Sequence, residues 1–474
     1  MPENTQKTDI SIIGGGFAGL SAALRLHRAG AKIQLFEKRP FFGGRAYSFA
    51  EPKTGEVVDN GQHLLMGAYH ETFAFLKDLG TLDKLHFQKG LEVSFAQGAE
   101  QFSTIKCPNL PAPFHLAWGL LRFKALKFGD KRRMAKLIQF CKKPQQNGQA
   151  LDDLSLLQLF RKTGQSQKAI QVFWEPLALA TLNEPLDLAS AELFVEVLKQ
   201  GLLSNKADSN LVIPKVGFSE LYAQPAQNLF QKDGVPMHFN SQIAAIEKSG
   251  STWEIKTNQG KSFSTEKILF AIPPNGLQKI LEVSDPSLKP LGEHLEKFKS
   301  SPIVSVNLWF DNFNPEQTFL GLIDSPIHWV FNKAKIYAPA PFGAGQSPLP
   351  SHEGRRPAPN GAGVGYLSLV ISGAYELAQK SKLQLIQLAT EELRRFYPAL
   401  RDQEPTHAQV IKENEATFSG RLGLKNYRPD PATAVPGIYL AGDWANTGLP
   451  ATIESAVRSG HQAANILLGK HHGE

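Results

Sequence analysis

The chain has 474 residues, of which 42% are hydrophobic and 20% are charged, with a net charge of +7. This composition is typical of a folded globular protein and excludes a disordered or fibrous one. The length exceeds what one hydrophobic core usually organises, so we expect two domains.

Cysteine usage and the first residues bear on the cellular compartment. Cys107 and Cys141 are the only cysteines, too few for a disulfide framework, and they form no Cys-x-x-Cys pair for a metal or redox site. The polar residues Met1 to Asp9 precede an apolar run, Ile10 to Ile13, that stops at glycine, so we expect no secretion signal. No stretch of about 18 uncharged apolar residues predicts a transmembrane helix. These features favour a protein of the reducing cytoplasm that binds no metal.

The positive charge is concentrated in one segment. Between Arg122 and Lys143 there are nine Lys or Arg residues and one acid, Asp130, which accounts for the whole excess. Such a patch fits an anionic membrane, a nucleic acid or plain solvent. No recognition fold accompanies the charge, so we expect no nucleic-acid partner.

The N-terminal residues predict a strand, a helix and a second strand, at Asp9 to Ile13, Phe17 to Ala29 and Lys32 to Phe36. Between the first strand and the helix stands Gly14-Gly15-Gly16-Phe17-Ala18-Gly19, a G-x-G-x-x-G pattern. Its glycines allow a tight turn, backbone contact with a pyrophosphate and close packing of helix on strand. The start of the helix then offers unpaired N–H groups to the phosphate.

An acid completes the expected dinucleotide site. Glu37 ends the second strand, 18 residues after Gly19. A carboxylate at this place accepts hydrogen bonds from the adenosine ribose hydroxyls and repels a 2′-phosphate.

Two further motifs follow closely. In Phe42-Gly43-Gly44-Arg45-Ala46, the paired glycines let backbone lie against a cofactor, and Arg45 supplies a cation for phosphate. In Val58-Asp59-Asn60-Gly61-Gln62-His63, Gly61 favours backbone against a flat ring. Gln62 and His63 then become candidates to hydrogen-bond a flavin or a substrate, although a single histidine is more often structural.

The middle of the chain alternates helical and strand patterns. We expect helices at Tyr69 to Leu79, across most of Pro111 to Gln200, and at Lys382 to Tyr397. Expected strands are Gln242 to Lys248, Trp253 to Thr257, Lys267 to Ala271, Ile303 to Phe310 and Tyr366 to Ile371. Residues 338–365 are rich in Pro, Gly, Ala and Ser, which predicts a mobile surface loop.

The C-terminal residues predict a strand, Gly437 to Ala441, and a helix, Ile453 to Leu467. Gly442-Asp443-Trp444 follows the strand, and Pro450-Ala451-Thr452-Ile453 leads into the helix. Thr452 is a suitable N-cap, and capping is compatible with a cofactor at the helix start.

Together these motifs resemble the FAD-dependent amine-oxidase and phytoene-desaturase superfamily. Three stretches, residues 58–69, 173–191 and 442–460, resemble more narrowly the hydroxysqualene dehydroxylase family, also called squalene-associated FAD-dependent desaturases. The resemblance spans nearly the whole chain. The loop at 338–365 looks like an insertion into the family pattern.

The resemblance implies an α/β fold with two interleaved domains. A Rossmann-like FAD-binding domain would use residues 1–80, 205–275 and 410–474. A substrate domain of antiparallel sheet and helices would use residues 81–204 and 276–409. FAD would be held without a covalent bond, because both cysteines lie far from the C-terminal motif. The expected cofactor contacts are Gly14, Gly16, Phe17, Ala18, Gly19, Glu37, Lys38, Gly43, Gly44, Arg45, Gly61, Gln62, His63, Ile243, Gly442, Asp443, Pro450, Ala451, Thr452 and Ile453.

The family also implies a reaction, the reductive removal of the allylic hydroxyl of hydroxysqualene to give squalene in bacterial hopanoid synthesis. Departure of the hydroxyl requires an acid, and the allylic cation then takes a hydride from reduced FAD. Gln62, His63, Glu175 and Asn183 are the catalytic candidates, and local pairing of Glu175 is an open alternative. No second dinucleotide motif identifies the electron donor.

Two other functions stay open. A carotenoid-type desaturase or an amine oxidase would use the same scaffold, and a flavin-binding prenyl carrier without catalysis would also fit the motifs.

A water-insoluble isoprenoid substrate favours docking on the inner face of the cytoplasmic membrane, through residues 113–143. Helical spacing predicts one apolar face of Phe114, Ala117, Trp118, Leu121, Ala125 and Phe128, and a second of Leu116, Leu120 and Phe123. Cations flank both faces, namely Arg122, Lys124, Lys127, Lys131, Arg132, Arg133 and Lys136. A domain helix with a solvated basic end is the alternative.

Overall fold

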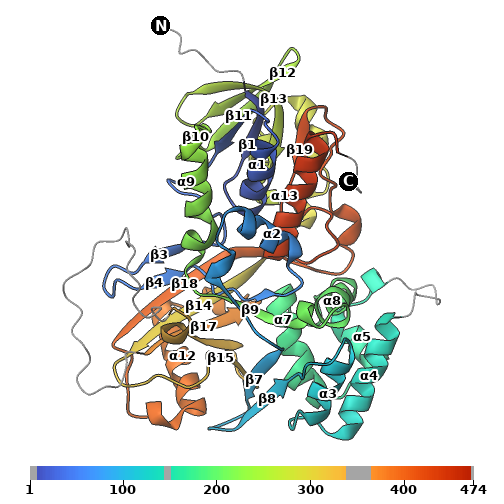
Figure 1. Cartoon of the computed structure of the whole chain (residues 1–474), viewed down its shortest axis with the longest axis vertical. Helices are drawn as coiled ribbons and strands as arrows, with labels where there is room; N and C mark the ends of the chain where they lie inside the picture. Colours follow the sequence, from blue (N-terminus) through green and yellow to red (C-terminus); the bar gives the residue numbers. More distant parts are fainter. Residues whose placement is uncertain (1–7, 143–150, 338–364, 471–474) are drawn as a thin grey trace.

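The computed structural model of the protein describes residues 8–142, 151–337 and 365–470. Within these residues the chain folds around two seven-stranded sheets and two smaller ones. In Figure 1 the first large sheet, which contains β1, lies at one end of the molecule, and the second, which contains β14, lies towards the other. The predicted α/β fold, in which discontinuous chain segments build the first sheet, is confirmed.

The first sheet has the strand order β10-β2-β1-β13-β12-β11, and β19 pairs with β13. Five of its strands run parallel, and β12 and β11 continue it in antiparallel fashion. β2 is buried along its whole length, as expected of a parallel strand covered on both faces. The bounds are β1 Thr8–Ile13, β2 Ile33–Phe36, β10 Met237–His238, β11 Ile243–Ser249, β12 Thr252–Thr257, β13 Ser262–Phe270 and β19 Ile438–Leu440.

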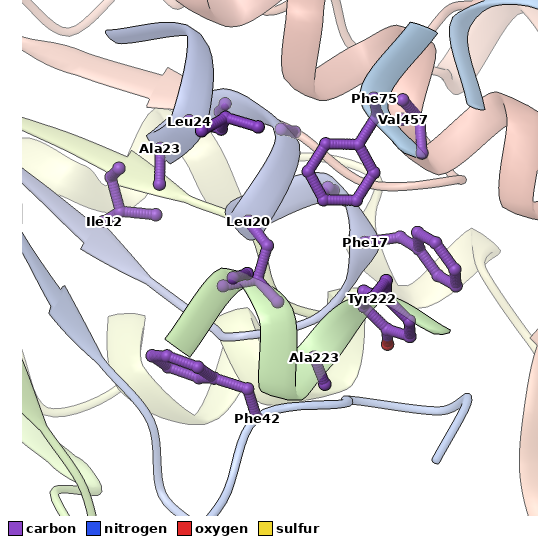
Figure 2. Close-up of a cluster of buried hydrophobic side chains, with 14 of the residues drawn as sticks. Ile12, Phe17, Leu20, Ala23, Leu24, Phe42, Phe75, Tyr222, Ala223 and Val457 are labelled. Atoms are coloured by element: carbon purple, nitrogen blue, oxygen red, sulfur yellow. The ribbon is translucent and has the colours of Figure 1, made fainter. Parts of the chain in front are cut away.

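Helices from both ends of the chain cover this sheet. α1 packs against α13, and a Cβ atom on Gly460 would lie 2.3 Å from the carbonyl oxygen of Ala18, so only glycine allows this approach. Figure 2 shows the core beneath, where Leu20 of α1 lies near Phe75 of α2 and Tyr222. The helices around this sheet are α1 Phe17–Arg28, α2 His70–Asp78, α9 Gln224–Lys232, α10 Pro274–Leu281 and α13 Ile453–Leu467.

The second sheet has the order β18-β14-β17-β16-β15-β7-β8 and is antiparallel except where β15 meets β7. Val304, Val306 and Leu308 of β14 pack in one core cluster with residues of α12. The alternate residues therefore point to the opposite face. The bounds are β7 Glu92–Ala96, β8 Phe102–Lys106, β14 Ser300–Phe310, β15 Phe319–Leu322, β16 Trp329–Asn332, β17 Gly365–Ser372, β18 His407–Phe418 and α12 Lys382–Phe396.

Short strands and helices complete the described chain. The small sheets join β3 Ser48–Ala50 with β4 Val57–Asp59, and β9 Leu211–Pro214 with β5 Leu65–Met66 and β6 Leu85–Phe87. Further helices are α3 Phe114–Arg122, α4 Phe128–Lys142, α5 Leu156–Lys162, α6 Gln167–Ala169, α7 Glu175–Leu182, α8 Ala191–Val197 and α11 Lys333–Ile336, with π-helical turns at Ile170–Trp174, Leu198–Leu203 and Ser219–Ala223. The 3₁₀ turns are Leu82–Lys84, Leu151–Asp153, Ala207–Ser209, Pro286–Gly292, Leu295–Lys297, Leu377–Gln379, Pro398–Leu400 and Lys425–Tyr427.

The structure corrects two sequence-based boundaries. The expected domain boundary at residue 410 falls inside β18, which pairs with β14 in the second sheet. This polar strand has few buried residues and so gives little apolar signal. The single helix expected from residue 113 to 128 is broken, because Phe123 has extended backbone and its side chain is buried in the core. Residues 338–364 of the expected loop, and Lys143, lie outside the described chain.

Candidate active site

The predicted cofactor motifs converge at one edge of the first sheet. β1, β2, β13 and β19 are parallel, and their carboxyl ends lead into Gly14, Glu37, Ala271 and Ala441 respectively. Ligands of open parallel sheets bind outside the carboxyl ends of the strands. Segments far apart in the sequence therefore build one site.

Bare backbone forms the centre of this edge. A Cβ atom on Gly19 would lie 1.9 Å from the carbonyl oxygen of Gly14, and Gly14 has a φ of +111°. Gly44 faces Gly16 so closely that a Cβ atom on it would lie 2.9 Å from the Gly16 Cα atom. The Gly43 N–H also donates to the carbonyl oxygen of Gly15 over 2.9 Å. The two glycine motifs thus pack directly against each other, backbone on backbone.

Glu37 braces the glycine loop. Its carboxylate is buried and accepts from the backbone N–H groups of Gly15 and Arg39, each over 2.9 Å. The neighbouring Lys38 side chain is exposed. Glu37 therefore lies where the sequence places it, next to the loop expected to bind a pyrophosphate.

The opposite ends of the predicted site meet in an ion pair. Arg45 Nη2 lies 2.6 Å from Asp443 Oδ1, although 398 residues separate them in sequence. Asp443 is nearly buried, whereas about a third of the Arg45 side chain is exposed. A hollow of about 310 Å³ lies beside the pair, lined also by Asn275, Lys299 and Thr417 among others. The cation expected to face phosphate is thus held in place by the acid of the C-terminal motif.

Arg428, which sequence reasoning missed, holds the C-terminal motif in shape. Its buried guanidinium donates to the carbonyl oxygens of Asp443, Trp444, Ala445 and Leu449, at 2.9, 3.3, 2.5 and 2.6 Å. Burial lowers the pKa of Arg428 to about 10. No sequence signal distinguishes this arginine from a surface one.

Three of the predicted contact residues have their side chains in the core. Phe17 stacks on Tyr222 with ring centroids 3.7 Å apart, as Figure 2 shows, and Tyr222 donates to the carbonyl oxygen of Gly43 over 2.6 Å. Ala18 is buried, and Ile243 packs at the start of β11. Any contact of these three residues with a cofactor would therefore use their backbone.

A partly open cavity lies at the start of α13. Thr452 caps this helix by accepting from the Ser455 N–H over 3.1 Å, as the sequence suggests. Ala451 and Ile453, on either side of it, are partly buried. The cavity is lined by residues of both halves of the molecule, namely Met66, Ala68, Tyr69, Thr181, Val197, Gln200, Gly201, Leu449, Pro450, Thr452 and Glu454. The cavity therefore lies between α13, beside the first sheet, and the helical region formed by α3 to α8.

Gln62 and His63 lie beside a buried ion pair. The His63 ring packs on Phe218 with centroids 4.9 Å apart, and its Nδ1 atom is buried without a hydrogen-bond partner in the described chain. Burial lowers the pKa of His63, against the influence of Asp59. Gln62 Nε2 donates to the carbonyl oxygen of His63 over 3.2 Å, and Gln62 Oε1 accepts from Lys333. Lys333 belongs to no sequence motif and was not among the candidates.

Glu175 and Asn183 differ in the contacts that their side chains make. Glu175 is partly buried, and burial, together with Asp324, raises its pKa. The Asn183 amide donates to Ser301 O and Thr417 Oγ1 and accepts from the Gly373 N–H. Asn183 therefore ties α7 to the second sheet, and its catalytic role stays a prediction.

The bare glycine backbone, the acid beside it and the unpartnered His63 Nδ1 fit a bound flavin dinucleotide. The sequence model of flavin-containing amine oxidoreductases matches residues 17–468. The chain belongs to this family. The family's flavin is therefore the cofactor. Across the described residues no helix is long and apolar enough to span a membrane, and no group of side chains suits a metal ion.

Individual family members differ in activity. The chain is 27% identical to the hydroxysqualene dehydroxylase of Zymomonas mobilis subsp. mobilis, over 96% of this chain and 98% of that protein. It is 25% identical to the 15-cis-phytoene desaturase of Glycine max, over 98% of this chain and 80% of that protein. Among solved structures, cyclohexylamine oxidase from Brevibacterium oxydans shares the fold, with a TM-score of 0.68, 14% identity and coverage of 98% and 99%.

Proposed function

We propose that this protein removes the allylic hydroxyl of hydroxysqualene, yielding squalene and water. The observation that carries the proposal is the match to a hydroxysqualene dehydroxylase along nearly the whole of both chains. The scaffold alone is shared with amine oxidases and desaturases, so the fold does not select among them.

FAD would be held without a covalent bond. Its pyrophosphate would lie against the Gly14 to Gly19 loop, with Glu37 beside the ribose and the Arg45–Asp443 pair near the phosphates and ribityl chain. Cys107 and Cys141 both lie in the core of the helical region, which supports a non-covalent site. When bound and reduced, FAD supplies a hydride.

The protein's own side chains would hold the substrate and keep water out. The cavity between the domains has a mostly apolar lining, with Met66, Val197, Leu449 and Pro450, which suits a hydrocarbon chain. His63, with a lowered pKa, would be neutral at pH 7 and would offer Nδ1 as a hydrogen-bond partner. The domain organisation we propose assigns residues 1–80, 205–275 and 419–474 to FAD binding.

A phytoene-type desaturase is the second candidate, because the Glycine max enzyme matches almost the whole chain at similar identity. Product analysis separates the two functions. Anaerobic incubation of the reduced protein with hydroxysqualene should give squalene, detected by gas chromatography and mass spectrometry. Formation of new double bonds by the oxidised protein, with hydroxysqualene left intact by the reduced one, would instead identify a desaturase.

We further propose that α3 and the start of α4 dock on an anionic membrane surface. Phe114, Trp118, Leu121 and Phe128 are 64%, 42%, 53% and 74% exposed, whereas Leu116 and Phe123 are buried. α3 thus has one face in the core and an apolar face outward. Arg122 lies over the Trp118 ring at 4.9 Å. Exposed aromatic residues beside cations are the arrangement of a helix that lies in a membrane interface.

Some cations of this surface make hydrogen bonds or ion pairs within the protein, and others make no ion pair in the described chain. Lys131 donates to the carbonyl oxygen of Leu121 over 2.7 Å, and Arg133 lies 3.9 Å from Asp130. Lys124, Lys127, Arg132 and Lys136 are exposed and make no ion pair within the described chain. These four are therefore the charges to test.

Changing Lys124, Lys127, Arg132 and Lys136 to Glu should weaken binding to vesicles containing phosphatidylglycerol at least tenfold, since each cation contributes about 1 kcal/mol near such a surface. Vesicle flotation measures the bound fraction. The matched control changes Lys232, Lys261, Lys279 and Lys289, all exposed elsewhere, to Glu and should bind as the wild type does. Equal loss in both variants, or equal binding by all three proteins, would contradict docking through this surface.

A further inference from the structure

Asp59 and Lys333 form an ion pair that is closed off from solvent. Lys333 Nζ lies 2.8 Å from Asp59 Oδ2, and the side chains are 1% and 2% exposed. Every other ion pair of the described residues has at least one side chain that is more than 15% exposed. A pair buried in this way pays a desolvation cost that its mutual attraction rarely exceeds, so stability alone does not account for it.

The pair sits in a dense set of polar contacts between the two domains. Asp59, at the end of β4, accepts from Ser48 Oγ over 2.8 Å, from the Phe218 N–H over 3.2 Å and from the Tyr337 hydroxyl. Lys333, at the start of α11, also donates to Gln62 Oε1 and lies 3.6 Å from the Tyr337 ring centroid. The ammonium group is thus held next to the Gly61 to His63 segment at the expected flavin site.

Several buried polar atoms without partners lie on two segments near this pair. His63 Nδ1, Ser305 Oγ, Asn307 Nδ2 and Gln409 Oε1 are buried and make no hydrogen bond in the described chain. Ser305 and Asn307 lie on one face of β14, and Gln409 is opposite Asn307 on β18. Tyr366, whose pKa burial and Asp59 both raise, donates to Asn307 Oδ1 over 3.1 Å and so places this face near Asp59. Unpaired buried polar atoms are rare in native proteins, and a group here points to a polar ligand atom.

Apolar and aromatic side chains adjoin the same place. Ile213, Phe319, Phe331, Ile336 and Val370 form one cluster, and Leu64, Ile303, Trp329 and Tyr337 pack against it. A polar group set beside such a cluster matches a long hydrocarbon that carries a single hydroxyl.

We propose that Lys333 is the acid that protonates the leaving hydroxyl of the substrate and that Asp59 is the positioning residue that keeps this proton on Lys333. The proposal rests on the proposed function. The Lys333 ammonium gives one proton to the hydroxyl oxygen, the carbon–oxygen bond breaks and water leaves. The allylic carbon takes up a hydride, which a reduced flavin supplies, and the Lys333 amine regains a proton from solvent through the hydrogen bonds of Asp59 and Tyr337.

The other ionisable groups at this place are less suited to the task. Burial lowers the pKa of His63, so its imidazole has no extra proton to give at neutral pH. Glu175 has no hydrogen bond or ion pair to the Gly61 to His63 segment, and the nearby charge is that of Asp324. Lys333 is the cation that the described structure holds in contact with Gln62.

The test uses the double variant Asp59→Asn with Lys333→Met in the full-length protein. Removing one member of a buried pair leaves an unpaired charge, whereas replacing both is often neutral for stability. The thermal unfolding midpoint and the bound FAD should therefore stay close to wild type in the double variant. As the matched control, Glu192→Gln with Lys425→Met removes an exposed ion pair with the same type of substitution, outside the site.

The rate of squalene formation from hydroxysqualene in a single turnover is the first readout. Loss of the acid should slow it at least a hundredfold, the usual contribution of a positioned proton donor, while the control keeps the wild-type rate. The wild-type rate should fall as pH rises and the Lys333 ammonium loses its proton. A stable, FAD-loaded double variant with the wild-type rate would overturn the proposal.

A binding measurement needs no turnover. The flavin absorbance change should report hydroxysqualene and squalene binding, and the double variant should lose about tenfold in affinity for the alcohol but not for the hydrocarbon. Equal effects on both ligands would contradict a contact between Lys333 and the hydroxyl. Failure of the wild type to make squalene would overturn the proposed function, and the alcohol-selective loss would still decide whether Lys333 faces a hydroxyl.

Discussion

Glu37 belongs to a sequence motif and makes a hydrogen bond with the glycine loop of that motif. Its two carboxylate oxygens hold the Gly15 and Arg39 N–H groups, and the ribose of FAD would share the same carboxylate. Glu37→Ala removes hydrogen bonds to a charged group, each worth about 1.5–3 kcal/mol. We expect FAD affinity to fall at least tenfold, measured by titration of the apoprotein with FAD. Wild-type affinity would show that the ribose is bound elsewhere.

Burial makes His328 a source of acid sensitivity. Its Nδ1 accepts from the Ser372 N–H over 3.0 Å, and burial lowers its pKa to about 4. The unfolded chain takes up this proton near pH 6.5, so the folded state loses stability as pH falls from about 6.5 to 4, by at most about 1.4 kcal/mol per pH unit.

Replacement of His328 by Asn should remove this part of the pH dependence. Thermal unfolding midpoints at pH 7, 6 and 5 should therefore fall less steeply in His328→Asn than in the wild type. The difference between the two slopes isolates His328 from the other titrating groups. Parallel slopes would show that His328 titrates normally in the folded protein.

The position of a single residue can be predicted from the sequence where a motif fixes the local backbone. Glu37, Arg45 and Asp443 each follow a glycine motif or end a strand, so their place at the sheet edge is predictable. Lys333 lies far from Asp59 in sequence, and the partners of Arg428 are carbonyl oxygens of a loop. A charged residue that belongs to no motif is expected on the protein surface. The buried positions of Lys333 and Arg428 could therefore not be predicted from residue types.

At the scale of elements, one arginine holds the loop between β19 and α13. Arg428 donates to four carbonyl oxygens of residues 443–449, which carry Asp443 into the site. Arg428→Lys keeps the charge but cannot span these acceptors, because lysine lacks the planar fork of guanidinium.

We expect Arg428→Lys to lose bound FAD and to unfold at a temperature several degrees lower, by the loss of buried hydrogen bonds. Retained FAD after gel filtration and the thermal midpoint measure the two effects. Full FAD content with an unchanged midpoint would contradict the role of Arg428 in shaping the loop.

In the segment from α3 to α4, the spacing of apolar residues predicts the wrong helix boundaries. Apolar spacing continues from Phe114 to Phe128, and the sequence predicts one helix with two apolar strips. Phe123 is extended and buried, so the helix ends at Arg122 and a second one begins at Phe128. Burial of one aromatic side chain outweighs local helical preference, because tertiary packing overrides propensity.

At the scale of the whole molecule, the order of elements was predictable and one boundary was not. The βαβ opening, the glycine motifs and the C-terminal strand and helix give strong local signals. β18 runs through the expected boundary at residue 410, because its polar sequence shows little of the apolar alternation by which strands are recognised. The two large sheets take their strands from alternating parts of the chain. This long-range pairing is visible only in the structure.

Single-turnover stoichiometry tests the central claim, reductive dehydroxylation, most directly. Protein whose flavin has been fully reduced without oxygen is mixed with excess hydroxysqualene, and flavin absorbance and squalene are measured together. Each reoxidised flavin should yield one squalene, at equal rates. A flavin that stays reduced while hydroxysqualene is recovered intact, or that is reoxidised without squalene, would contradict the account.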